Sequence, residues 1–103
     1  MMIRDNGDFF AHVNRAALNN SAAVIHRLLP NGKIQGNEYA ALNPKRADER
    51  IGSFKVNMTT GRWADFATGD KGGDLISLTA YLHGMSQIQA ARRLADMLGV
   101  SHG

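Results

Sequence analysis

The sequence contains no cysteine, which excludes disulfide bonds, thiolate metal sites and a cysteine nucleophile. Only two prolines and one tryptophan occur among its 103 residues. No run approaches the roughly 18 apolar residues that a membrane-spanning helix needs. A secretory signal would need an apolar run near the start, where Arg4, Asp5 and Asp8 stand instead. With 44% hydrophobic residues, the chain is expected to form one small core in a cytoplasmic protein with no membrane partner.

Motifs for catalysis are missing as well. The four histidines are far apart in the sequence and lack metal-ligand spacing. No phosphate-binding loop or nucleophile elbow is present. The only cluster of carboxylates is Asp65, Asp70 and Asp74; it could hold Mg²⁺, but one helix cap and two turn residues are the better interpretation. We therefore expect no enzyme active site, no metal and no cofactor.

The positive charge is concentrated in the middle of the chain. The net charge is +3, and six of the twelve Lys and Arg residues fall within 43–71. That segment has a net charge of +2, against +1 for the residues before it and 0 for those after it. The concentration favours a surface that faces a polyanion. A solvated, charged loop region is the alternative.

The first 30 residues predict two helices. Asp8 can cap a helix over 9–18, and Ser21 can cap a second helix that runs to about Leu29. The Pro-Asn-Gly sequence at 30–32 then ends the helix and turns the chain.

The middle of the chain predicts strands. An edge strand is expected around 36–41, and Asn43-Pro44 ends it. Residues 53–58 alternate strictly between apolar and polar, which predicts a strand followed by a hairpin at 59–61. The returning strand, 62–66, should contain a bulge or end near Asp65, because Trp63 and Phe66 fall on opposite faces of a regular strand.

The last third is helical by its capping signals. Asp74 suits the N-cap of a helix that ends at Gly84, and Ser86 with Gln89 has the spacing of a capping box. Gly99 closes this last helix. The fold class is therefore α+β with a small antiparallel sheet. The expected core consists of strand side chains packed on helix side chains, namely Phe54, Val56, Trp63 and Phe66 against Leu75, Leu78, Ile88 and Leu94.

Basic and aromatic residues interleave around the hairpin. Alternation buries Phe54 and leaves Lys55 and Arg62 facing outward. Trp63 could stack on a base or belong to the core. The glycine-rich loop at 69–73, which contains Lys71, could bind a phosphate at the helix N-terminus, although Asp74 already suits that cap and a structural loop is equally compatible.

One segment resembles a known family. The run Gly61 to Ile76, with its Gly72-Gly73-Asp74, and the later Arg93-Leu94-Ala95 resemble the N-terminal zinc-ribbon domain of bacterial and phage-type DNA primases. The resemblance covers about 30–100. It implies a zinc-ribbon-like unit at 31–103, which follows the helical segment expected at 1–30, and the two should form one compact domain.

The sequence departs from this family at the zinc ligands. The two metal knuckles should fall near 43–48 and 65–69, where no thiol and no histidine stands. The pattern resembles a metal-free version found in primase-like replication proteins of plasmids, phages and integrated elements. Zinc is therefore not carried over, and its role should pass to aromatic burial and to a pair of Arg46 with Asp65 or Asp48. The motif positions carried over are Asn43, Pro44, Phe54, Phe66, Gly72, Gly73 and Asp74.

The resemblance implies a non-catalytic module that binds nucleic acid, specifically single-stranded template DNA, in a primase-type DNA replication protein. Because the chain holds no catalytic domain, it is not expected to synthesise primers alone; both a complete protein and a fragment or accessory part of a primase are compatible with the sequence. Its protein partners would be a primase catalytic domain, a polymerase or a helicase. The alternative is an adaptor that only docks a replicative polymerase or helicase. The expected DNA-binding residues are Lys45, Arg46, Lys55, Arg62 and Lys71 for the backbone, with Trp63 as the stacking residue.

Overall fold

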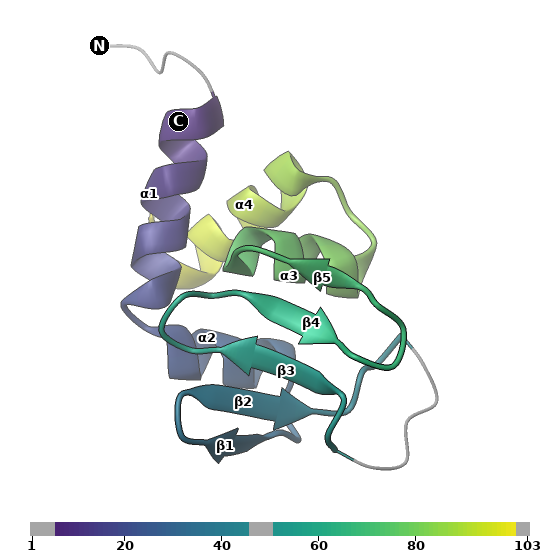
Figure 1. The fold of residues 1–103 in the computed structure, drawn as a ribbon. Helices are drawn as coiled ribbons and strands as arrows, with labels where there is room; N and C mark the ends of the chain where they lie inside the picture. Colours follow the sequence, from purple (N-terminus) through teal and green to yellow (C-terminus); the bar gives the residue numbers. More distant parts are fainter. Residues whose placement is uncertain (1–5, 46–50, 101–103) are drawn as a thin grey trace, which may run out of the picture.

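The computed structural model describes residues 6–45 and 51–100. It contains two helices, then five strands, then two helices (Figure 1). In chain order these are α1 (Asn6–Leu18), α2 (Ser21–Leu28), β1 (Lys33–Gln35), β2 (Glu38–Ala41), β3 (Phe54–Asn57), β4 (Trp63–Asp65), β5 (Lys71–Gly72), α3 (Leu75–His83) and α4 (Gln87–Leu98).

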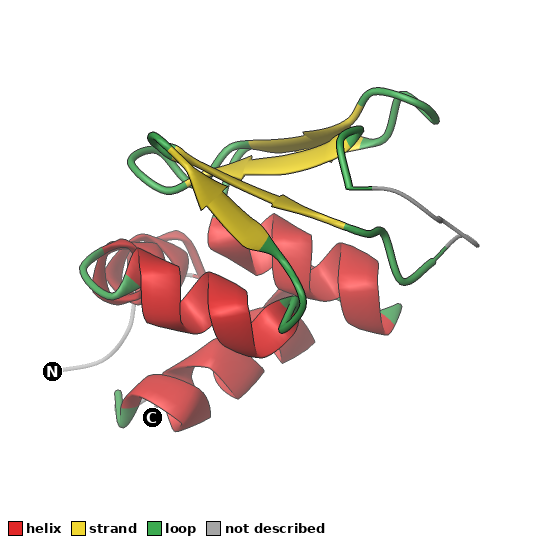
Figure 2. Ribbon diagram, turned by 90° about the horizontal axis from the view of Figure 1, so that it is seen from below, coloured by secondary structure: helices red, strands yellow, loops and turns green. Residues whose placement is uncertain are grey.

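The five strands form one antiparallel sheet in sequence order, β1-β2-β3-β4-β5. The helices all lie against one face of it (Figure 2). The predicted α+β class with a small antiparallel sheet is therefore confirmed. The opposite face of the sheet, which we call the outer face, carries no helix among the described residues. None of the described helices is long and apolar enough to cross a membrane.

The hairpin between β3 and β4 forms where the sequence predicts it. The Asn57 side-chain oxygen accepts hydrogen bonds from the amides of Thr59 and Thr60, at 2.8 and 3.0 Å. Gly61 then adopts φ +81°, a conformation that side chains with a Cβ rarely take. This turn sets the register in which Val56 lies opposite Trp63.

The core lies between the inner face of the sheet and the helices. Phe54 is fully buried, and its ring meets the Trp63 ring edge-on, with 6.1 Å between centroids. Helix α1 packs on α3 and α4 and adds Val13 and Ala17 to the same cluster. The expected core is confirmed at Val56, Leu75, Leu78 and Leu94, while Ile88 is partly buried against it.

The N-terminal boundaries differ from the prediction. Helix α1 begins at Asn6, so Asp8 lies within its first turn, where a carboxylate still meets the positive end of the helix dipole. Helix α2 has Asn20 at its N-cap rather than Ser21, and it ends at Leu28. In contrast, the predicted caps of α3 and α4 are confirmed. Both helices have a complete capping box, and both end at a glycine with positive φ.

Two strands were not anticipated. The single edge strand expected at 36–41 is a hairpin, because Gly36 takes φ +63° and turns β1 back onto β2. The phenol of Tyr39 is buried there and donates to the Leu29 carbonyl at 2.6 Å. Part of the expected glycine loop is β5, whose Lys71 and Gly72 pair with β4.

Phe66 was expected in the core, and this prediction is wrong. Its side chain is 72% exposed. Strand β4 ends at Asp65, and alternation from the inward-facing Trp63 places Phe66 on the outer face. The break predicted near Asp65 is therefore real, but the aromatic side chain beyond it does not turn back into the core.

Gly72 offers a test of this packing, because β5 runs directly against Trp63. A Cβ at Gly72 would lie 2.4 Å from both the Trp63 indole nitrogen and the Ser77 hydroxyl oxygen, so both side chains or the strand itself would have to shift. We expect Gly72→Ala to lower the free energy of unfolding by about 1–3 kcal/mol, as overpacked substitutions do. Urea denaturation measures this change.

The neighbouring glycine is the control. A Cβ at Gly73 would meet no atom within 4 Å. Gly73→Ala should therefore change the free energy of unfolding by no more than about 0.5 kcal/mol. Equal losses from both variants would mean that β5 does not lie against Trp63.

Candidate nucleic-acid interface

A row of side chains crosses the outer face of the sheet in register. Lys33 lies opposite Ala40, Ala40 opposite Lys55, Lys55 opposite Ala64, and Ala64 opposite Lys71. Every second strand thus contributes a lysine, and an alanine separates each pair. We call Lys33, Lys55 and Lys71 the lysine row. Because neighbouring strands are roughly 4.8 Å apart, successive lysines of the row are spaced by about 10 Å at the backbone.

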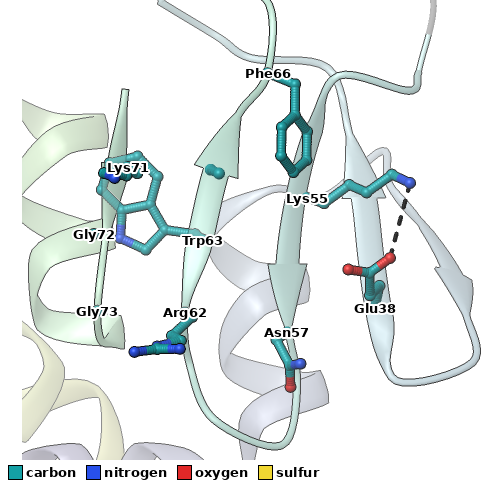
Figure 3. Close-up of a pocket in the computed structure, with 10 residues that line it drawn as sticks. Glu38, Lys55, Asn57, Arg62, Trp63, Phe66, Lys71, Gly72 and Gly73 are labelled. Atoms are coloured by element: carbon teal, nitrogen blue, oxygen red, sulfur yellow. Dashed lines mark ion pairs between the residues drawn. The ribbon is translucent and has the colours of Figure 1, made fainter. Parts of the chain in front are cut away.

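An open groove of about 670 Å³ lies over the part of this row that contains Lys55 and Lys71, as Figure 3 shows. Phe66 stands at one end of the groove and Arg62 at the other, with Lys55 and Lys71 on either side of β4. Ala64 lies between the two lysines, and its short side chain does not fill the groove. The groove is thus lined by three cations and one exposed aromatic ring.

One carboxylate also lines the groove. Glu38 on β2 lies 3.8 Å from the Lys55 ammonium (Figure 3). The Lys55 side chain is 32% exposed and that of Glu38 is 46% exposed, so water screens the pair and it contributes little to stability. An incoming anion can compete with Glu38 for Lys55 at small cost.

The structure brings together three of the predicted backbone-binding residues: Lys55, Arg62 and Lys71. Lys45 does not line the groove; its ammonium lies 5.3 Å from the centroid of the Tyr81 ring. Arg46 lies outside the described residues.

Trp63, considered as a stacking residue, belongs to the core instead. It is 5% exposed, and its indole nitrogen donates to the Ser77 hydroxyl at 2.9 Å. The exposed aromatic residue of the groove is Phe66. Sequence reasoning placed Phe66 in the core, although strict alternation from an inward-facing Trp63 would have identified it as outward-facing.

The start of α3 is not an open phosphate site. The Asp74 carboxylate accepts from the Ser77 amide at 2.7 Å and from the side-chain amide of Asn14 at 3.2 Å. Asn14 in turn accepts from the Ile76 amide at 3.3 Å. The predicted cap therefore occupies this terminus. Gly72 and Gly73 line the groove at the edge of the sheet.

A hydrogen-bonded cluster lies where the resemblance places the two metal knuckles. The side-chain amide of Asn43 donates to Asp65 at 2.8 Å and to the phenol oxygen of Tyr81 at 2.9 Å. Tyr81 donates to Asp70 at 2.8 Å. We call Asn43, Asp65, Asp70 and Tyr81 the polar clasp. Asn43 is 1% exposed and Asp65 is fully buried, so the connection between them is shielded from water.

Zinc does not fit this cluster. Structural zinc sites are built from thiolates and imidazoles, and the clasp offers an amide, two carboxylates and a phenol. No group of three His, Cys, Asp or Glu able to hold a metal occurs within 6–45 and 51–100. The polar atoms of the clasp already bond to one another. The predicted pairing of Arg46 with Asp65 or Asp48 involves residues outside the described ranges.

The protonation of Tyr81 suits its place in the clasp. Burial raises the pKa of the phenol above its ordinary value of 10.0, and the hydrogen bond and negative charge of Asp70 raise the pKa further, while the bond from Asn43 lowers it. The phenol therefore keeps its proton at neutral pH and can donate to Asp70.

Comparison with known proteins adds a likeness of fold. No protein-family model matches the sequence, and no curated protein is significantly similar to it. The structure resembles the crystal structure of the Aquifex aeolicus primase, which comprises zinc-binding and RNA polymerase domains, with a TM-score of 0.75 and 24% identity. The match covers 92% of this chain and 22% of that one. The chain therefore shares its fold with part of a primase, in agreement with the primase zinc-ribbon resemblance of its sequence.

Proposed function

We propose that the chain is a non-catalytic nucleic-acid-binding module of a primase-type DNA replication protein, and that it holds single-stranded template DNA on the outer face of its sheet. One observation carries the proposal. The open groove gathers Lys55, Arg62 and Lys71 around the exposed ring of Phe66, on a fold shared with a primase. Cations beside an exposed aromatic ring are the combination that binds single strands with little regard to sequence.

In this arrangement the phosphate backbone follows the lysine row across the strands. Ala64 leaves space between Lys55 and Lys71, so the backbone can approach the sheet there. A base then stacks on Phe66 at one side of the row, while Arg62 contacts a phosphate at the other. Lys33 extends the row to the far edge of the sheet.

The module would position a template for chemistry performed elsewhere. The catalytic domain of a primase is the natural partner, with a polymerase or helicase as further candidates. A plasmid, phage or integrated element is the proposed source, since the metal-free motif resembles replication proteins of such elements. The adaptor function remains the second candidate. It is favoured by Ile34, a 61% exposed apolar side chain on the edge strand β1, which suits a protein contact better than a DNA contact.

The affinity for a fluorescently labelled oligo(dT), followed by anisotropy over a range of salt concentrations, tests the proposal. Three to four engaged cations should give a slope of about −2 to −3 for log K against log salt, at about −0.7 per neutralised phosphate. A wild-type protein that binds no oligonucleotide at low salt, yet binds a polymerase or helicase, would decide for the adaptor function.

Phe66→Ala should weaken this binding without affecting the fold. Loss of one stacked base costs about 1–3 kcal/mol, which is roughly a 5- to 150-fold loss of affinity. Phe66→Trp should retain the affinity because it retains a ring. Ile34→Ala is the matched control, since Ile34 is the other large exposed hydrophobic residue within the described ranges. If both alanine variants weaken binding equally, Phe66 is not a stacking residue.

A further inference from the structure

The turn that carries Phe66 is built around Asp65. The Asp65 carbonyl accepts from the amides of Thr68 and Gly69, at 3.3 and 2.8 Å, and its carboxylate accepts from the Ala67 amide at 2.8 Å. The Asp65 amide donates to the Asp70 carbonyl at 2.8 Å, which closes the turn. One buried residue thus fixes the backbone of the turn that begins with Phe66.

Within the polar clasp, Asn43 and Tyr81 lie outside this turn and bond to its two ends. Asn43 binds the carboxylate of Asp65, and Tyr81 binds that of Asp70. The bond between Asn43 and Tyr81 joins the two contacts into one unit. The clasp therefore connects the segment after β2, the two ends of the β4–β5 turn, and helix α3. Asn43 and Asp65 lie in the two segments where the resemblance places the metal knuckles.

We propose that the polar clasp takes the place of a structural metal, and that Asn43 and Tyr81 act as positioning residues for nucleic-acid binding through Phe66. The inference rests on the proposed function and adds what controls the stacking residue. Without Asn43, the buried Asp65 carboxylate loses a donor, so the turn must rearrange to replace it. Without the Tyr81 hydroxyl, Asn43 loses an acceptor, and the exposed Asp70 carboxylate loses the contact that ties this end of the turn to α3. A mobile Phe66 must then be ordered when a base binds, which lowers affinity.

The effect should be confined to Phe66. Lys55 lies in the centre of the sheet, and Lys71 is held by the pairing of β5 with β4. Phe66 follows Asp65 directly and extends into solvent, with its own amide bound to the Ser53 carbonyl at 2.8 Å. Loosening the clasp should therefore displace Phe66 and leave the phosphate contact of Lys55 in place.

A double-mutant cycle separates positioning from general destabilisation. Tyr81→Phe removes only the hydroxyl, and Asn43→Ala removes the whole amide. We expect each to lower the affinity for oligo(dT) about two- to tenfold in the wild-type background, under conditions where the variants are folded. In the Phe66→Ala background the same substitutions should have almost no effect. In the Lys55→Ala background their full effect should persist, because Lys55 lies in the middle strand β3, away from the turn.

Equal losses in all three backgrounds would overturn the positioning role, and so would unchanged affinity in both clasp variants. If the wild type binds no oligonucleotide, the proposed function fails by itself. Amide exchange then decides on the clasp: faster exchange at Ala67 and Gly69 in Tyr81→Phe supports control of the turn, and unchanged exchange refutes it.

Metal analysis tests the other half of the inference. The purified protein should contain no stoichiometric zinc, and EDTA should leave its melting temperature unchanged. One bound equivalent of zinc, with unfolding on chelation, would show that a metal performs the role assigned to the clasp.

Discussion

Replacing Phe54 by Ala is expected to lower the free energy of unfolding by about 3–5 kcal/mol. Phe54 is fully buried at the centre of the sheet, and its ring contacts both Trp63 and Tyr81, with centroids 6.1 and 6.2 Å apart. Alanine would leave a cavity that these rings cannot fill. Since small domains have only about 5–15 kcal/mol of stability, this loss should be visible as a large shift of the urea midpoint.

Phe66→Ala provides the internal comparison, because it removes the same ring from the other face of the sheet. With 72% of Phe66 exposed, its truncation should change the free energy of unfolding by at most about 0.5 kcal/mol. If Phe54→Ala instead melts like the wild type, the inner and outer faces of β3 have been assigned the wrong way round.

Reversing Lys55 and Arg62 together to Glu is expected to abolish binding of single-stranded DNA. Both residues line the groove on the outer face, so the exchange replaces two attractive charges by two repulsive ones and leaves the core untouched. Anisotropy with oligo(dT) at low salt measures the loss, and the melting temperature should stay close to that of the wild type.

A reversal of Arg92 and Arg93 is the matched control. Both are exposed on α4, on the side of the molecule where the helices lie, and their exchange to Glu changes the net charge by the same amount. Binding should fall far less than in the groove variant. Equal losses from the two pairs would indicate diffuse attraction to the whole protein, and the groove would no longer be a site.

The parts of the fold that depend on neighbouring residues could be predicted from the sequence. The caps at Asp74 and Ser86, the glycine ends of α3 and α4, and the turn at Gly61 each involve residues a few positions apart. Local hydrogen bonds decide such features, so the residue types alone reveal them. The alternation that points Lys55 outward is equally local.

The features that depend on distant contacts were missed. Strand β5 exists because it pairs with β4, and neither Lys71 nor Gly72 has a strong strand propensity. The hydrogen bond between Asn43 and Asp65 joins residues 22 positions apart, and the spacing of two small polar residues does not predict such a contact. Phe66 was assigned to the core because hydrophobicity was given more weight than its position after the end of the strand.

The arrangement of the lysine row also bears on aggregation. Its outer members lie on the two edge strands, Lys33 on β1 and Lys71 on β5. Free edges present unpaired backbone groups to other chains, and short edge strands that carry lysine discourage such pairing. Here the edge strands are only three and two residues long. The cations proposed to bind DNA would therefore also oppose edge-to-edge assembly of this sheet with other chains.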